Sequence, residues 1–224
     1  MDTAVGEEGT EGSSVSHLLF VAIWAAAGLG LLAQLVSIAA RLSVGAKIPG
    51  GQMLVDVVGG ISWSVIVCGA LSLGVTASRN AGELTMGLLG ALGAPLGFSV
   101  AKGAQRGVQW MADMPGDQIG TLVFVTAGLK AAEYALLGYM LSRLLGTPRS
   151  TPRNHVLLGA AFGLVFGGLI LAANMKFQGA LPTVKIVGLT TNEFLFPVGC
   201  SVLIYWFARL TNNLNVRTQL LAGH

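Results

Sequence analysis

A lysine and a glutamate stand three positions apart inside the apolar stretch 124–140, which reads FVTAGLKAAEYALLGYM. This spacing places Lys130 and Glu133 on one face of a helix, close enough to form an ion pair. A single charge at membrane depth costs about 3 kcal/mol on insertion scales, and a paired couple costs far less. We therefore expect the pair to face protein or water, with Tyr134 beside it as a hydrogen-bond donor.

Two interpretations of this pair stay open. In the first, Glu133 is the titrating group of a proton- or ion-linked site, and Lys130 keeps it ionised until a substrate or a proton competes. In the second, the two charges neutralise each other and fix the register of the helix. The two interpretations differ in the effect that they predict when one of the two charges is removed.

A second candidate site comes from a pattern that occurs twice. Residues 95–99 read PLGFS and residues 197–201 read PVGCS, so both are Pro-x-Gly-x-Ser. Interrupted helices in matching positions of two halves indicate a transporter site, and ordinary proline kinks are the alternative. Glu193 precedes the second copy, with helix capping as its alternative role. The pattern adds the binding candidates Pro95, Gly97, Ser99, Glu193, Pro197, Gly199 and Ser201.

Catalytic chemistry finds little support in the sequence. No GxSxG, HExxH, Walker A or GxGxxG motif occurs. Glu133 and His155 on adjacent spans distantly resemble the Glu and His usage of the CAAX-protease-like membrane families, whose paired glutamates and downstream arginine are absent around Glu133. We therefore expect no enzyme, no catalytic residue, no metal site and no cofactor, and an intramembrane hydrolase is the weakest alternative.

The composition indicates a membrane protein. Hydrophobic residues make up 53% of the chain and charged residues 10%, and the mean hydropathy is +0.71, more than a soluble domain of this length needs for its core. The net charge of +3 gives no reason to expect nucleic acid as a partner. Cys68 and Cys200 lie in apolar runs, so we expect free thiols. The expected partner is the lipid bilayer.

The gaps between charged residues predict an all-α fold, a polytopic bundle of about six transmembrane helices, because about 20 apolar residues cross the hydrocarbon core. The sixth span contains Glu193 and Pro197, so five spans is the alternative. Residues 1–16 are expected to be a disordered acidic tail, residues 17–210 the single transmembrane domain, and residues 211–224 a short polar tail. Residues 101–117 are expected to form an interfacial segment. The predicted spans are 18–40, 57–78, 84–101, 118–142, 156–175 and 186–208.

Small residues recur every four positions in three of these spans. Such GxxxG-type spacing lets helix backbones approach closely in lipid. The spacing predicts packing within one bundle, and a face for partner subunits or for a second copy of the chain is the alternative. The residues concerned are Ala22, Ala26 and Gly30 in the first span, Gly93 and Gly97 in the third, and Gly159, Gly163 and Gly167 in the fifth.

Orientation and function complete the predictions. The Lys and Arg residues divide equally between the two sides, and the basic loop TPRSTPRNH favours termini on the cytoplasmic side of a plasma (inner) membrane. The intramembrane Lys-Glu pair and the repeated pattern favour a transporter, a channel-like protein or a solute-binding membrane component. A non-catalytic membrane subunit of a larger complex is the alternative.

Overall fold

The computed structural model describes residues 8–114 and 120–222. This part of the chain contains helices and no strand, which confirms the predicted all-α fold. Long apolar stretches with few helix-breaking residues explain why each element is a helix of several turns. The six helices are α1 (Glu8–Ser43), α2 (Gly50–Ala81), α3 (Glu83–Met111), α4 (Thr121–Leu145), α5 (Pro152–Gln178) and α6 (Thr183–Ala222).

Each helix includes a segment that is long and apolar enough to cross a membrane, so the chain is a multi-spanning membrane protein with six candidate spans. The sixth span, which the sequence left in doubt, runs through Glu193 and Pro197 as one helix. The six segments are Leu19–Ser43, Gly50–Ser78, Glu83–Met111, Thr121–Leu145, Pro152–Gln178 and Thr183–Asn213.

Three predicted boundaries differ from the structure. The helix α1 begins at Glu8, inside the predicted disordered tail, and α6 continues to Ala222 through the predicted C-terminal tail. The helix α3 extends to Met111 and takes in most of the predicted interfacial segment. No proline lies in 8–16, 101–111 or 211–222, so nothing in these stretches forces a helix to stop. Residues 1–7, 115–119 and 223–224 lie outside the described part.

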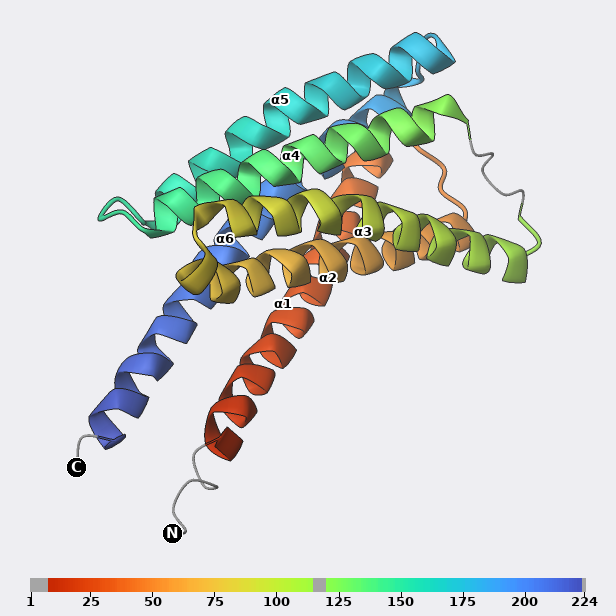
Figure 1. Cartoon of the computed structure of the whole chain (residues 1–224). Coiled ribbons are helices and arrows are strands. Elements are labelled where there is room, and N and C mark those ends of the chain that lie inside the picture. Colours follow the sequence, from red (N-terminus) through yellow and green to blue (C-terminus); the bar gives the residue numbers. More distant parts are fainter. Residues whose placement is uncertain (1–7, 115–119, 223–224) are drawn as a thin grey trace.

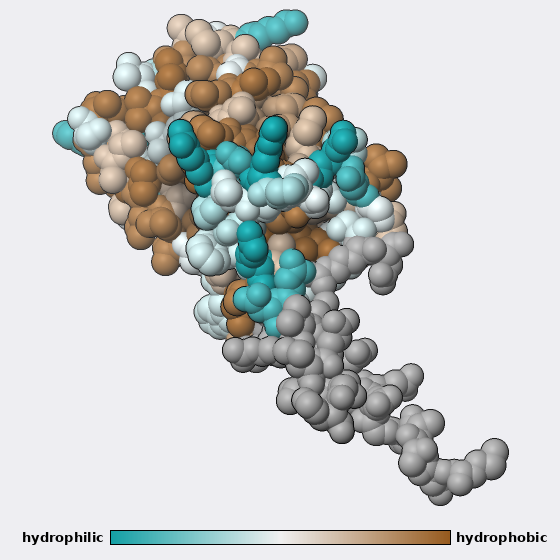
Figure 2. Space-filling model, turned by 90° about the vertical axis from the view of Figure 1, so that its left-hand side faces the viewer, coloured by the Kyte–Doolittle hydropathy of each residue, from teal (hydrophilic) through white to brown (hydrophobic). Residues whose placement is uncertain are grey.

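Consecutive helices alternate in direction, so both ends of the chain lie at the same end of the bundle (Figure 1). We call this the termini end, and we call the opposite end, where α1, α3 and α5 finish, the distal end. The helices α2, α4 and α6 each contact four of the other helices, so these three form the centre of the bundle. Figure 2 shows the termini end, where hydrophilic residues gather and hydrophobic residues surround them.

Several of the predicted small residues lie where helices approach each other. A Cβ on Gly30 would lie 2.6 Å from the carbonyl oxygen of Gly60, and one on Gly159 would lie 2.5 Å from that of Pro197. A Cβ on Gly163 would lie 3.0 Å from Cα of Phe194. These distances are too short for a larger side chain, so the glycines permit close contact of α1 with α2 and of α5 with α6.

The half of the bundle toward the termini end has a core of closely packed apolar side chains. Its fully buried side chains include Leu71, Met86, Leu141 and Ile204. Between this core and the distal half, Sγ of Cys68 lies 3.3 Å from Sγ of Cys200, and both cysteines are free thiols, as predicted. The distal half is built differently, around charged and amide side chains.

Candidate functional site

The predicted ion pair is present, and it has a third member. The Nζ of Lys130 donates a hydrogen bond to Oε2 of Glu133 at 2.9 Å and another to Oε2 of Glu193. All three side chains are buried, and Glu133 has no exposed surface. We call these residues the lysine–carboxylate cluster. It joins α4 to α6 through an ammonium group with two carboxylate partners.

The sequence around Glu193 explains how it reaches Lys130. Glu193 is the eleventh residue of α6, so the capping alternative is wrong. Pro197 has no N–H, so the helix lacks the one backbone hydrogen bond that residue 197 would otherwise donate to the Glu193 carbonyl. On α5, a Cβ on Gly167 would lie 3.0 Å from Cβ of Glu193, so this glycine makes room for the glutamate.

Aromatic rings surround the ammonium group. The Nζ of Lys130 lies 5.5 Å from the ring centroid of Trp63 and 5.6 Å from that of Tyr134, within the range of cation–π attraction. The two rings pack edge to face with centroids 5.5 Å apart. The Tyr134 hydroxyl and Oε1 of Glu133 are buried without a hydrogen-bond partner in the described structure, so the hydrogen bond expected from Tyr134 is not formed.

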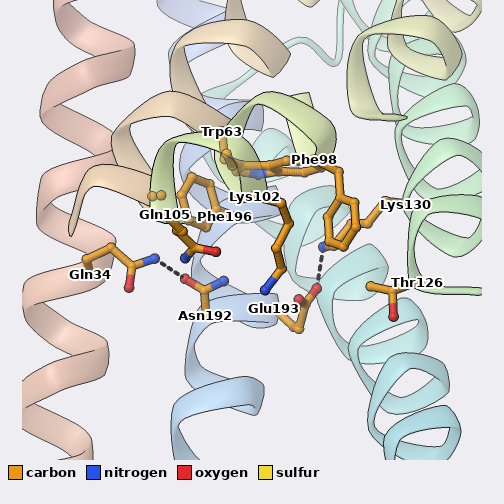
Figure 3. A pocket seen from close by; sticks show the side chains of 13 residues that line it. Gln34, Trp63, Phe98, Lys102, Gln105, Thr126, Lys130, Asn192, Glu193 and Phe196 are labelled. Carbon is orange, nitrogen blue, oxygen red and sulfur yellow. Dashed lines mark hydrogen bonds and ion pairs between the residues drawn. The ribbon is translucent and has the colours of Figure 1, made fainter. Parts of the chain in front are cut away.

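The charge of the cluster does not cancel internally. One ammonium and two carboxylates carry a formal charge of −1 when all are ionised. Lys130 and Glu193 lie about 14–15 Å along their helices from Thr121 and Thr183, comparable with half of a hydrocarbon core of roughly 30 Å. Figure 3 shows the side chain of Lys102 pointing toward Glu193.

A cavity of about 130 Å³ adjoins the cluster (Figure 3). Its wall combines three aromatic rings, three side-chain amides and charged groups, the mixture that is typical of sites for small organic molecules. The side chains come from every helix except α5. The lining residues are Gln34, Gly59, Gly60, Trp63, Phe98, Ala101, Lys102, Gln105, Thr126, Lys130, Asn192, Glu193 and Phe196.

A larger chamber of about 580 Å³ lies next to this cavity on the distal side of the bundle, and we call it the vestibule. The vestibule and the cavity share Phe98, Lys102, Thr126 and Glu193 as lining residues, so the two spaces adjoin. Among the described residues, the charged side chains that line the vestibule are Lys102, Arg106, Lys185 and Glu193.

Two glycines of α2 leave room for two of the amide side chains that line the cavity. A Cβ on Gly59 or on Gly60 would collide with the side chain of Gln105 or of Gln34, respectively. The Nε2 of Gln34 donates a hydrogen bond of 2.8 Å to Oδ1 of Asn192, which links α1 to α6. The Gly-Gly step of α2 thus lets α1 and α3 place polar groups against its backbone.

The repeated Pro-x-Gly-x-Ser segments form the same local geometry but no interruption. Both α3 and α6 pass through their prolines as continuous helices, so the predicted broken helices are wrong. Ser99 donates to the carbonyl of Pro95 at 2.9 Å, and Ser201 donates to that of Pro197 at 2.7 Å. The cavity is lined instead by their neighbours Phe98 and Phe196, and by none of Pro95, Gly97, Ser99, Pro197, Gly199 and Ser201.

His155 lies far from the lysine–carboxylate cluster. Its Nδ1 lies 2.9 Å from the carbonyl oxygen of Thr151, and its ring centroid lies 4.9 Å from that of Tyr205. Twelve residues of α5 separate it from Gly167, which packs on Glu193, and this corresponds to about 18 Å along the helix. The structure therefore does not bring Glu133 and His155 together as the hydrolase alternative requires.

The residues that sequence reasoning missed are those that meet only through packing. Trp63 and Lys102 line the cavity without any local motif. Asp56 belongs to another group, since its carboxylate pairs with Arg41 at 2.5 Å. A signal for Glu193 existed, because a carboxylate in an apolar helix needs a partner, and Lys130 is the only basic residue inside the predicted spans.

Within the described residues, no group of three or more His, Cys, Asp or Glu side chains could hold a metal ion. No family model, curated protein or solved structure matches the chain.

Proposed function

We propose that this protein is a small membrane transporter whose solute site is the cavity beside Lys130 and Glu193. The observation that carries the proposal is the cavity itself: charged, amide and aromatic groups converge on it about halfway along the helices, and it adjoins a vestibule toward the distal end. Buried charges within membrane helices mark solute and ion pathways, because they are too costly to keep for packing alone.

The charge arrangement supports a working site over a purely structural pair. Lys130 and Glu133 alone would neutralise each other, but Glu193 adds a carboxylate that a self-sufficient pair does not need. Oε1 of Glu133 has no hydrogen-bond partner, and an unsatisfied buried oxygen is a cost to stability that a functional role can explain.

The alternative from the sequence, a non-catalytic membrane subunit of a larger complex, loses part of its support. The small residues that could have formed a face for a partner include Gly30, Gly159 and Gly163, and each of them packs against a helix of the same chain.

The test is uptake into proteoliposomes that contain the purified protein. Three radiolabelled probes with similar rings and different charges cover the ligand classes: nicotinate, nicotinamide and 1-methylnicotinamide. Ala101 lines the cavity and is buried, so Ala101→Phe should fill the site, whereas its neighbour Val100 is 42% exposed and Val100→Phe is the matched control.

We expect uptake of at least one probe above that of empty liposomes, its loss in Ala101→Phe and its retention in Val100→Phe. Uptake of none of the three probes by the wild type would overturn the proposal. Equal uptake by Ala101→Phe and the wild type would overturn the assignment of this cavity as the route.

A further inference from the structure

We infer that the solute is a small uncharged ring that carries an amide group, and that the side-chain amides of Gln34, Gln105 and Asn192 recognise it. This inference rests on the proposed function and names the ligand class of the same cavity. Three observations support it: the walls and the size of the cavity, the hydrogen-bonding groups of the amides, and the partners that the charged side chains already have.

The walls and the size of the cavity suit one flat ring. Trp63, Phe98 and Phe196 line the cavity, and its volume of about 130 Å³ compares with the roughly 150 Å³ of an engineered apolar cavity that binds benzene. Aromatic side chains stack on planar rings of many kinds, so these walls select a flat shape more than one compound. They define the body of the solute and do not determine its polar groups.

Three side-chain amides offer hydrogen-bonding groups to a solute. The bond from Nε2 of Gln34 to Oδ1 of Asn192 leaves the carbonyl oxygen of Gln34 and the amino group of Asn192 to other partners. Gln105 takes no part in this bond and brings a third amide to the cavity from α3. Figure 3 shows the three amide ends on one side of the cavity and the bond between Lys130 and Glu193 on the other.

An amide group on the solute complements these side chains. It holds N–H donors and a carbonyl acceptor in one plane, so it can pair edge to edge with another amide through two hydrogen bonds. Asn and Gln side chains recognise the edge of adenine by a bidentate contact of this kind. A carboxamide on a ring presents such an edge, whereas a ketone on the same ring lacks the donor. The amides therefore favour a ring with a carboxamide or a similar edge.

The charged side chains at the cavity already have partners. Lys130 donates hydrogen bonds to Glu133 and to Glu193, and Lys102 has an interaction partner too. An ionic solute would have to replace one of these contacts, and a charge that loses its partner at this depth is costly. An uncharged solute leaves all of them in place. The amides are therefore the polar groups through which a solute binds without breaking an ion pair.

Calorimetric titration of the full chain in detergent compares the affinities of four probes with similar rings. Nicotinamide carries the carboxamide, and 3-acetylpyridine has a methyl group in place of its amino group. Nicotinate and 1-methylnicotinamide carry a negative and a positive charge. We expect nicotinamide to bind at least about tenfold more tightly than each of the other three, because the ketone leaves a buried acceptor without its donor and the ions disturb paired charges.

Two variants and a matched control test the role of the amides. Gln105→Leu and Asn192→Leu each replace an amide by an apolar side chain of similar size. At least one of them should reduce the preference for nicotinamide over 3-acetylpyridine at least about threefold, the effect of one lost hydrogen bond. A purely structural role would weaken both ligands alike and keep the preference. Gln109 is buried four residues further along α3 and does not line the cavity or the vestibule, so Gln109→Leu should keep the wild-type preference.

The outcomes separate this inference from the proposed function. Equal affinity of the wild type for nicotinamide and 3-acetylpyridine, or tighter binding of nicotinate or 1-methylnicotinamide, would overturn the inferred ligand class. Uptake of any of these probes into proteoliposomes would still leave the transporter proposal standing. An undiminished preference in both Gln105→Leu and Asn192→Leu would overturn the role of the amides. Failure of all four probes to bind or enter would remove the proposed function as well.

Discussion

At the termini end, α2, α3, α4 and α6 meet through the apolar side chains of Leu71, Met86, Leu141 and Ile204, all without exposed surface. A few turns toward the distal end, the same helices surround Lys130, Glu193 and an open cavity. The helices and their crossings are shared, so the difference lies in the side chains. The termini half can hold the bundle together while the distal half gives up packing for a polar site.

The first test, with the largest expected loss of stability, concerns the contact between α5 and α6. Gly163→Leu should lower the free energy of unfolding by about 3 kcal/mol, because its side chain would push α5 away from the α6 backbone at Glu193 and Phe194. Gly168→Leu is the matched control, since nothing lies within 4 Å of a Cβ at that position. Equal stability of the two variants in mixed micelles would show that α5 does not pack on α6 in this way.

A second test concerns the apolar core of the termini half. Leu137 has no exposed surface, whereas its neighbour Leu136 is 49% exposed to the membrane. Leu137→Ala should cost about 2 kcal/mol, the low end of the range for such cavities, because the unfolded helix stays in lipid and transfer from water contributes little. Leu136→Ala should cost less than half as much. The same chemical denaturation measures both, and equal losses would contradict a packed core in the termini half.

A third test asks whether Glu193 belongs to the cluster. A double-mutant cycle between Lys130→Met and Glu193→Gln should give a coupling energy of about 1–2 kcal/mol, since the two groups interact directly in a buried site. A coupling near zero would mean that Lys130 and Glu133 act as a self-sufficient pair. The cycle uses stability alone, so it does not depend on the identity of the solute.

The smallest coupling energy is expected for an exposed ion pair at the termini end, which is the control for the buried pair of Lys130 and Glu193. The Nε of Arg143 lies 3.3 Å from Oε2 of Glu83, with side chains 61% and 52% exposed. The cycle between Arg143→Met and Glu83→Gln should give less than about 0.5 kcal/mol, because water screens exposed pairs. A coupling as large as that of Lys130 and Glu193 would break the distinction between the two halves.

How far the sequence predicts this structure depends on the range of the interaction. Hydropathy and charge spacing are local, so they predicted six spans and the pairing of Lys130 with Glu133. The bond between Lys130 and Glu193 joins residues 63 positions apart, and the cavity wall draws on five helices. Such contacts depend on how the helices cross, which composition and periodicity do not specify.

The repeated Pro-x-Gly-x-Ser segments are a local pattern from which we predicted interrupted helices, and that prediction was wrong. Proline removes one backbone hydrogen bond, and a transmembrane helix tolerates that loss when neighbouring groups compensate. Pro95 and Pro197 therefore lie in continuous helices, with Ser99 and Ser201 bonded to their carbonyls. The pattern did lie near the site, because Phe98 and Phe196 beside the two prolines form cavity walls.

If the cavity is the solute site, solute and water must reach it from the distal end, and cysteine accessibility measures this access. Thr126 lines both the cavity and the vestibule, so Thr126→Cys places a thiol on the route. The buried native thiols are removed with Cys68→Ala and Cys200→Ala. Lys47→Cys in the distal loop and Arg149→Cys in the termini-end loop mark the two sides of sealed vesicles.

A membrane-impermeant thiol reagent should modify Thr126→Cys from the side that modifies Lys47→Cys, and not from the side that modifies Arg149→Cys. Leu137→Cys, in the buried apolar core, should stay unmodified from both sides. Modification of Thr126→Cys from neither side, or from the Arg149 side alone, would contradict a cavity that opens toward the distal end.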